Sequence, residues 1–74
     1  MKSTVTYAEH VGRAVRKRRK SLGMSVKELA AAAGVDASAM YSWERGRRRL
    51  DINRLPSIAI ALQITVSDIF RDAG

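Results

Sequence analysis

The sequence predicts an all-α fold of five short helices in a single domain. In five segments of the 74-residue chain, apolar residues recur at intervals of three and four, which is the spacing of amphipathic helices. Helix-capping residues and glycines separate these segments. A chain of this length forms one domain with a modest core, and no strand is predicted.

The first helix is expected from about Tyr7 to Ser21. Residues 1–6, which precede it, are polar and lack periodicity, so they are expected to form a flexible N-terminal tail. Gly23 follows the helix closely and is a common stop, because glycine adopts left-handed backbone angles at little cost. The apolar arc of the helix comprises Tyr7, Val11, Ala14, Val15 and Leu22.

A basic run at residues 16–20 crosses several faces of this helix. The simplest interpretation of such a run is a solvated surface. Arg18 and Arg19, however, flank the apolar arc, so we expect their aliphatic stems to be partly buried. A buried guanidinium requires an acidic partner, and Glu44 is the best candidate in the sequence. We therefore predict an ion pair between Arg19 and Glu44 that serves mainly to orient two helices.

The centre of the chain, residues 25–46, is predicted to form two short helices joined by a tight turn. Ser25 and Glu28 have the spacing of a capping box at the start of the first. Gly34 supplies the turn, and Asp36 caps the second helix, which is expected to run to about residue 45. Two helices joined in this way form a helix-turn-helix motif, whose second helix enters the major groove of DNA.

The second of these helices has two different faces. One is apolar and faces the core, and it consists of Ala39, Met40 and Trp43 together with the incoming Val35. The other is small and polar, and it consists of Ala37, Ser38, Tyr41, Ser42 and Arg45. Small residues let a helix approach base edges, and hydroxyls can bond to bases or phosphates. An ordinary surface helix would show the same pattern, so this helix alone does not decide between the two interpretations.

Four arginines lie within five positions around Gly46: Arg45, Arg47, Arg48 and Arg49. The dipole of the preceding helix favours a cation at its C-terminus, which accounts for one or two of them but not for four. Arginines on a short loop beside such a helix are well placed to bind phosphates. The net charge of +7 and the sequence pI of about 10.9 also indicate a polyanionic partner. Nucleic acid fits better than a membrane surface, because the few large apolar side chains are needed in the core.

The fourth helix is expected at residues 55–63. Pro56 is favoured at the first helical position. The preceding residues 50–54 are interpreted as a connection, with a possible helical turn capped by Asp51. The core face of the helix is expected to consist of Ile58, Ala59 and Leu62.

The last helix is predicted to begin after Thr65. Asp68 lies three residues further on, in a capping-box arrangement. Residues 71–74 are expected to form a C-terminal tail, which places the domain at residues 7–70. The apolar residues of this helix are Val66, Ile69 and Phe70.

From Val11 to Phe70 the sequence resembles the Cro and repressor type of helix-turn-helix domain, also called the xenobiotic-response-element (XRE) family of transcriptional regulators. The matching stretches are VRKRRKSLGMSVKELAAAAGVDASAMYSWERG and IALQITVSDIF. The groups that lie at the family's spacing are Gly23-Met24-Ser25, Glu28-Leu29-Ala30, Gly34-Val35 and Trp43-Glu44-Arg45-Gly46. The resemblance implies a compact five-helix, lambda-repressor-like domain that binds double-stranded operator DNA, usually as a two-fold homodimer.

The resemblance also implies roles for individual positions. The family's base-reading positions fall on Ala37, Ser38 and Ser42. Its backbone-contacting positions fall on Val26, Tyr41 and the loop of Arg47, Arg48 and Arg49. Neighbouring polar residues complete the candidate contacts to the DNA backbone: Ser25, Lys27 and Arg45. The family's arginine-to-glutamate lock falls on Arg19 and Glu44, the pair already predicted from periodicity. Candidates for the dimer interface, unless they only close the core, are Val66, Ile69 and Phe70.

Four positions depart from the family's pattern. Val26 replaces a common glutamine that anchors to phosphate, and its side chain cannot make that bond. Arg18 lies where an aliphatic residue is common, and Arg45 replaces a common asparagine. Gln63 lies where glycine is frequent. None of these changes is expected to break the fold.

The three expected base-reading residues are poor readers of sequence. Neither alanine nor serine can make the bidentate hydrogen bonds by which arginine reads guanine or glutamine reads adenine. We therefore expect weak base readout in each half-site. Specificity would then come from dimer spacing, from DNA shape and from an arginine in a minor groove.

The composition argues against an enzyme and against a metal site. The chain contains no cysteine and one histidine, which excludes cysteine-based nucleophiles and metal ligands. Ser38 and Ser42 have no neighbouring base that would activate them. No cofactor and no small-molecule ligand are expected.

No membrane association is expected either. No apolar run approaches the ~20 residues of a membrane span, and no signal peptide is identified, so the expected location is the cytoplasm, with association to the nucleoid when DNA is bound. The rival function is a protein-interaction module that docks an acidic partner through the same basic surface. RNA binding is a weaker rival, because only Tyr41 is expected to be exposed for stacking.

Overall fold

The computed structural model describes residues 7–73. The predicted N-terminal tail, residues 1–6, and the last residue lie outside the described part of the chain. The described residues form five α-helices and no strand, which confirms the predicted fold class. These helices are α1 (Tyr7–Ser21), α2 (Val26–Ala33), α3 (Ala37–Glu44), α4 (Leu55–Ala61) and α5 (Val66–Ala73). Residues 71–73 were predicted to be a tail but continue α5, because its first turn is capped and residues 71–73 contain no proline or glycine that would end it.

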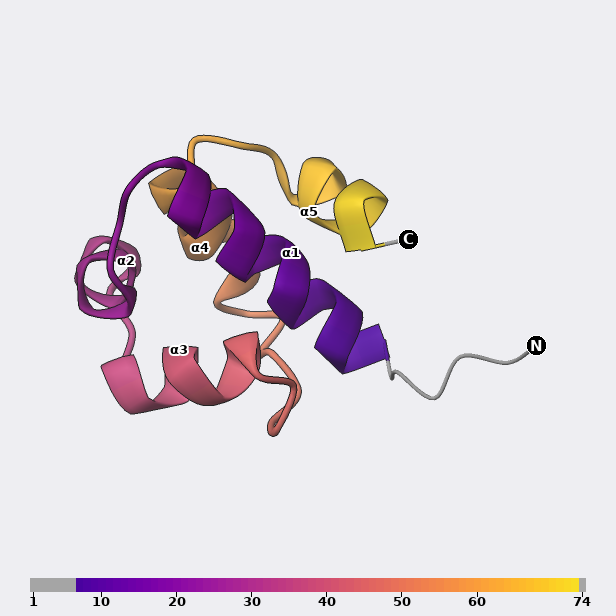
Figure 1. Cartoon of the computed structure of the whole chain (residues 1–74), viewed down its shortest axis with the longest axis horizontal. Coiled ribbons are helices and arrows are strands. Elements are labelled where there is room, and N and C mark those ends of the chain that lie inside the picture. Colours follow the sequence, from indigo (N-terminus) through magenta and orange to yellow (C-terminus); the bar gives the residue numbers. More distant parts are fainter. Residues whose placement is uncertain (1–6, 74) are drawn as a thin grey trace.

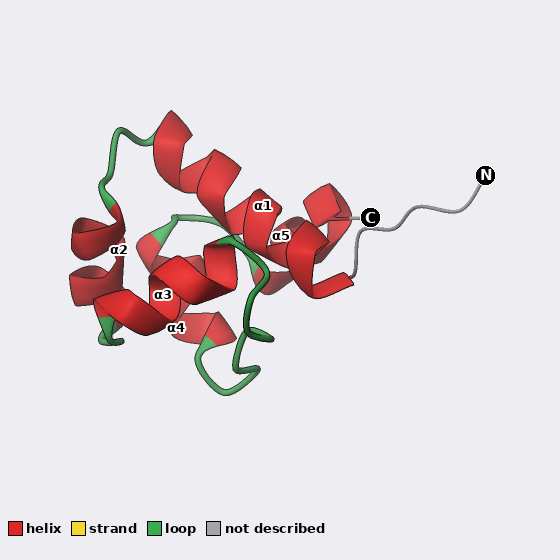
Figure 2. Cartoon of the chain, turned by 60° about the horizontal axis from the view of Figure 1, so that its bottom comes forward, coloured by secondary structure: helices red, strands yellow, loops and turns green. Residues whose placement is uncertain are grey.

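The longest helix, α1, runs diagonally through the domain between α3 and α5 (Figure 1). It packs against α3 on one side and against α5 on the other, whereas α2 packs against α3 and α4. Figure 2 shows α2 and α3 side by side at an angle, joined by a short turn. This arrangement leaves one side of α3 free of other helices.

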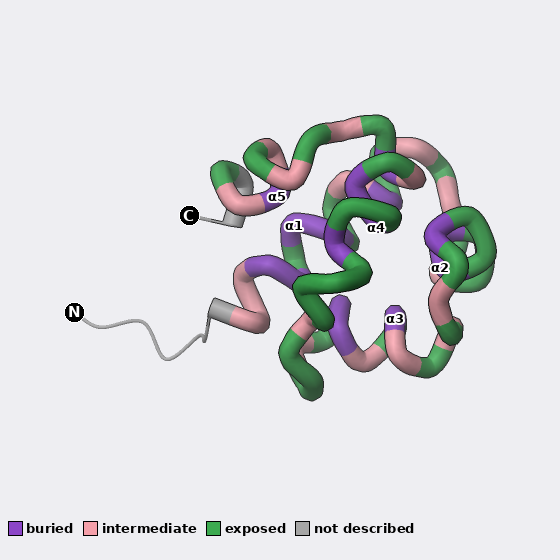
Figure 3. Tube along the Cα trace, turned by 180° about the vertical axis from the view of Figure 1, so that it is seen from behind, coloured by how far each residue is buried: buried purple, intermediate pink, exposed green. Residues whose placement is uncertain are grey.

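The core lies where the inner faces of these helices meet (Figure 3). It is small and aliphatic, apart from one tryptophan. Its largest fully buried side chains are Val15, Leu29, Met40, Ile58, Leu62 and Ile69. Within residues 7–73, no helix is both long enough and apolar enough to cross a membrane.

Three of the helices begin with the caps that the sequence predicts. The Ser25 hydroxyl accepts a bond from the Glu28 N–H (3.0 Å), and the Glu28 carboxylate accepts one from the Ser25 N–H (2.7 Å), so the capping box of α2 is complete. Thr65 and Asp68 make the same reciprocal pair at α5. The Asp36 side chain caps α3 by accepting from the Ala39 N–H. Bonds from the Ser25 and Thr65 residues hold the pKa of Glu28 and of Asp68 below the usual range.

The end of α4 differs from the prediction. The helix ends at Ala61, two residues before the predicted Gln63, and Leu62 forms its C-cap. Gln63 has a φ of 59°, a left-handed conformation that cannot continue a helix. The position therefore has a left-handed backbone, which glycine adopts without strain and glutamine adopts here at some cost.

The connection before α4 forms a hydrogen-bonded turn and not the single helical turn that the sequence left possible. The Asp51 side chain accepts a hydrogen bond from the Asn53 N–H (2.9 Å), and its carbonyl accepts one from the Arg54 N–H (2.9 Å). Asp51 therefore has a capping-type role, but in an Asx turn.

Arg18 has a partner that the sequence did not reveal. Its Nε donates to the Leu62 carbonyl at the C-terminal end of α4 (2.9 Å). That carbonyl lacks an intrahelical partner and carries part of the negative end of the helix dipole. Arg18 thus ties α1 to the end of α4, which explains why a cation is tolerated at a position that is commonly aliphatic.

Candidate nucleic-acid interface

A buried ion pair holds α1 against the C-terminal end of α3. Arg19 Nε lies 2.8 Å from Glu44 Oε2, and Arg19 Nη2 lies 2.9 Å from Oε1, so the contact is bidentate. The side chains are 10% and 3% exposed, respectively. Arg19 Nη1 also donates to the Met24 carbonyl in the loop before α2 (2.7 Å). The structure contains the predicted pair, and the bond to Met24 extends it so that one guanidinium fixes α1, α3 and the start of α2.

The backbones of α1 and α3 approach each other closely at Gly12. A Cβ atom at this position would overlap the carbonyl oxygen of Trp43 and crowd the backbone of Glu44. Gly12 is buried, and sequence reasoning did not assign it a role. The available signal was a glycine inside a helix, where it is less favourable than alanine by about 0.5–1 kcal/mol and needs a packing reason.

The face of α3 that points away from the core carries the predicted reading residues. Ser38 and Tyr41 are exposed, whereas Ala37 and Ser42 are half-buried at the edge of the face. The Arg45 guanidinium lies over the Tyr41 ring, 4.3 Å from its centre. This cation–π contact orients both long side chains along the outer surface of α3.

Arg47, Arg48 and Arg49 are all exposed on the loop that follows α3, and we refer to these three residues as the arginine loop. The loop starts at Gly46, whose φ of 71° turns the chain out of the helix. A side chain at Gly46 would collide with Glu9 of α1, so this turn is also held close to the first helix.

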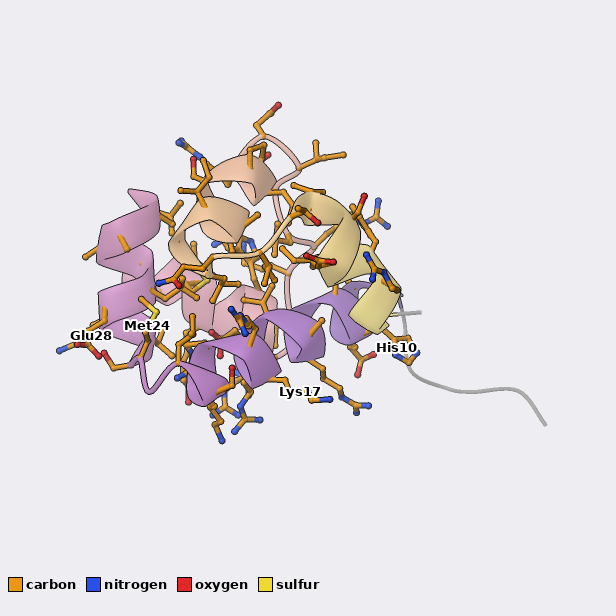
Figure 4. All side chains as sticks on the ribbon, turned by 90° about the horizontal axis from the view of Figure 1, so that it is seen from above. His10, Lys17, Met24 and Glu28 are labelled. Carbon is orange, nitrogen blue, oxygen red and sulfur yellow. The ribbon has the colours of Figure 1, made fainter. Side chains whose placement is uncertain are left out.

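The start of α2 presents fewer polar groups than the family's pattern implies. Ser25 and Lys27 are exposed, but the Ser25 hydroxyl is engaged in the capping box. Val26 is half-buried and packs against the core, so it has a structural role in place of the family's phosphate anchor. Figure 4 shows Glu28 and Met24 close together at this end of α2.

Residues 15–69 match a family model described as Helix-turn-helix. The chain belongs to this family. Its type is that of the XRE regulators, as the sequence resemblance implied. Within the helix-turn-helix, α2 is the first helix, Gly34 is the turn with a φ of 71°, and α3 is the second helix.

Two curated relatives are similar to this helix-turn-helix chain. It is 38% identical over 64 residues to an uncharacterized HTH-type transcriptional regulator of Sinorhizobium medicae, covering 86% of this chain and 46% of the relative. It is 40% identical over 63 residues to an uncharacterized transcriptional regulator in the ATPase CF(0) region of Rhodospirillum rubrum, covering 85% and 58%. The chain therefore spans about half the length of the curated relatives it matches.

Two solved structures share the fold. The clp gene regulator ClgR of C. glutamicum superposes with a TM-score of 0.87 at 32% identity, covering 93% of this chain and 90% of that one. The restriction-modification controller protein C.AhdI of Aeromonas hydrophila gives a TM-score of 0.81 at 29% identity, covering 84% and 94%. These similarities extend to the whole five-helix domain rather than to the helix-turn-helix alone.

The structure separates the three candidates for a dimer interface in this helix-turn-helix domain. Ile69 is fully buried in the core of its own chain, so it follows the alternative in which these residues only close the core, and it is not available to a second copy. Val66 and Phe70 are half-buried. Phe70 borders an open apolar hollow of about 350 Å³ between α1, α5 and the connection after the arginine loop. We call this the apolar hollow, and its lining residues are Ala8, Val11, Arg49, Leu50, Ile52, Leu55 and Phe70.

Proposed function

We propose that this chain is a transcriptional regulator that binds double-stranded operator DNA with α3 in the major groove. The observation that carries the proposal is the outer face of α3, where Ser38 and Tyr41 are exposed, beside three exposed arginines on the adjoining loop. A helix of this kind can approach base edges, while the arginine loop reaches the phosphates that border the groove. The names of the relatives as regulators, and of the structural neighbours as a gene regulator and a controller protein, support the same function.

The arginine loop provides the first test. The double variant Arg47→Gln/Arg48→Gln should weaken binding on every duplex and lower the slope of log K against log salt by about 1.8, since each neutralised phosphate contributes about 0.9. The measurement is fluorescence anisotropy on a random duplex and on a pool selected for tight binding, at several salt concentrations. The wild-type chain should bind selected sites at least about a thousandfold more tightly than random DNA.

A matched control for this test removes the same charge elsewhere. Lys20→Gln/Arg71→Gln removes two exposed cations of α1 and α5 and should change the slope much less. If the wild-type chain binds DNA no better than a polycation of equal charge, the proposal fails. An acidic protein partner would then account for the arginines.

We further propose that α3 reads bases weakly. Ser38 is exposed at the start of the helix, and its hydroxyl can bond to more than one base. Ser38→Ala should therefore change the preference for selected over random sites less than about threefold, well under the roughly 1–3 kcal/mol of a bidentate readout pair. The same anisotropy assay, run on both DNA pools, gives this ratio. A loss of a hundredfold would show that Ser38 reads the operator directly.

We also propose that the regulator acts as a homodimer through the apolar hollow. Ile52 at its border is 73% exposed, and Phe70 borders the same hollow, so a second copy could cover both. Dimerisation would supply the second half-site that a domain of this size needs for specificity.

Ile52→Glu should weaken the dimer, because a charge would be buried without a partner. Ile60→Glu is the matched control, since Ile60 is 77% exposed on α4 and does not border the hollow. Sedimentation equilibrium of the full chain gives the dissociation constant, which should rise at least about tenfold for the Ile52 variant only. Dissociation caused by the Ile60 variant instead would place the interface on α4.

A further inference from the structure

The outer face of α1 carries a second set of cations that the proposed function has not used. Arg13, Arg16, Lys17 and Lys20 are all exposed and lie at helical spacing, opposite the buried residues of the same helix. Figure 4 shows Lys17 pointing away from the other helices. The four cations fall into two pairs along α1. The N-terminal pair, Arg13 and Arg16, lies next to α3, whereas Lys17 and Lys20 lie further along the helix.

The close crossing at Gly12 brings Arg13 and Arg16 beside the C-terminal end of α3. There they line a polar hollow of about 190 Å³ together with Arg45, the C-cap of α3. We call this the arginine hollow, and its lining residues are Glu9, Arg13, Arg16, Glu44 and Arg45. It is separate from the arginine loop and draws its cations from two helices.

The charges around the arginine hollow do not balance. Both carboxylate oxygens of Glu44 accept hydrogen bonds from Arg19, so this charge is already neutralised. The other charged residues that line the hollow are three arginines and one acidic residue, Glu9. Guanidinium groups bind tetrahedral oxyanions such as phosphate by paired, charge-assisted hydrogen bonds. A hollow with this excess of positive charge is suited to an anion.

We propose that the arginine hollow binds a phosphate group of the DNA strand beside α3. This inference rests on the proposed function, and it adds a contact from α1 to those of the arginine loop. Arg45 connects the arginine hollow with the outer face of α3, because it lines the hollow and also stacks on Tyr41. When that face enters the major groove, the sugar–phosphate backbone runs along both flanks of the helix, within reach of long side chains.

The test compares two double variants of the full chain on a random-sequence duplex across a series of salt concentrations. Arg13→Gln/Arg16→Gln removes two cations from the hollow, and Lys17→Gln/Lys20→Gln removes the same charge from the same helix outside it. For one phosphate contact, the arginine variant should lower the slope of log K against log salt by about 0.9, which corresponds to about tenfold weaker binding near 0.1 M salt. The lysine variant should keep most of the slope.

Four results would overturn the inference. An equal loss of slope in both double variants, or no loss of slope in the arginine variant, would show that the hollow does not contact DNA. Salt-dependent binding by the wild-type chain would still support the proposed function in either case. Arg13→Lys/Arg16→Lys keeps both charges and should restore the slope, so its failure to do so would assign the loss to packing. The hollow would be a site for the free anion and not for DNA if two results came together. Inorganic phosphate would shift the arginine Nε–H resonances of the wild-type chain, and Arg13→Gln/Arg16→Gln would leave the slope for DNA unchanged. A wild-type chain without salt-dependent DNA binding would instead reject the proposed function itself.

Discussion

Glu44→Leu should destabilise the domain by about 3–5 kcal/mol, because it leaves the buried guanidinium of Arg19 without its counter-charge. A 74-residue domain has a total stability of roughly 4–11 kcal/mol, so this single change removes a large part of it. At about 4–8 °C per kcal/mol for a domain of this size, the midpoint of thermal unfolding should fall by more than about 10 °C. Urea denaturation followed by circular dichroism gives the free energy directly.

The double variant Arg19→Met/Glu44→Leu distinguishes a buried charge from lost packing. Replacing both partners by apolar side chains removes the desolvation cost of the pair, so the double variant should recover most of the stability lost in the single variant. The coupling between the two positions would then be large and favourable. If the single variant loses less than about 1 kcal/mol, the pair is better solvated than its 10% and 3% exposure indicates.

The parts of the fold that could be predicted from sequence are those with local causes. The capping boxes of α2 and α5 join residues only three apart, so the residue types at that spacing are sufficient evidence. The Arg19–Glu44 pair joins residues 25 apart, yet it could also be predicted. A cation at the edge of an apolar arc needs a partner, and few carboxylates lie near a core face.

The parts that could not be predicted depend on tertiary geometry. Arg18 bonds to the carbonyl of Leu62, and a carbonyl is present at every residue, so no side chain marks the acceptor. Ile69 and Phe70 lie on the same apolar arc of a short helix, and the packing of α5 on α1 decides which of them is buried. The exposure of the arginine loop follows from its charge, whereas its place beside α3 follows from the turn at Gly46.

At Gly12 the backbones of α1 and α3 are in close contact, and both the fold and the candidate interface depend on this contact. Gly12→Ala would ordinarily stabilise a helix, by up to about 1 kcal/mol, since alanine is the best helix former. Here the added methyl group would overlap the Trp43 carbonyl, a backbone atom that cannot rotate away. The two helices must therefore separate. The Arg19–Glu44 ion pair joins the same two helices, so their separation lengthens its hydrogen bonds.

We therefore expect Gly12→Ala to destabilise the domain by about 1–3 kcal/mol in spite of its favourable helix propensity, which is the usual range for overpacking. Thermal unfolding should show a midpoint lowered by roughly 5–20 °C. Lys17→Ala, on the exposed face of the same helix, is the control and should change stability by less than about 0.5 kcal/mol. A Gly12→Ala protein that melts at or above the wild-type temperature would show that α1 and α3 are not in backbone contact. Helix propensity predicts that Gly12→Ala raises stability, whereas steric overlap with Trp43 predicts that it lowers it. The sign of the change in stability therefore tests the crossing of α1 and α3, on which the placement of α3 and the arginine hollow depends.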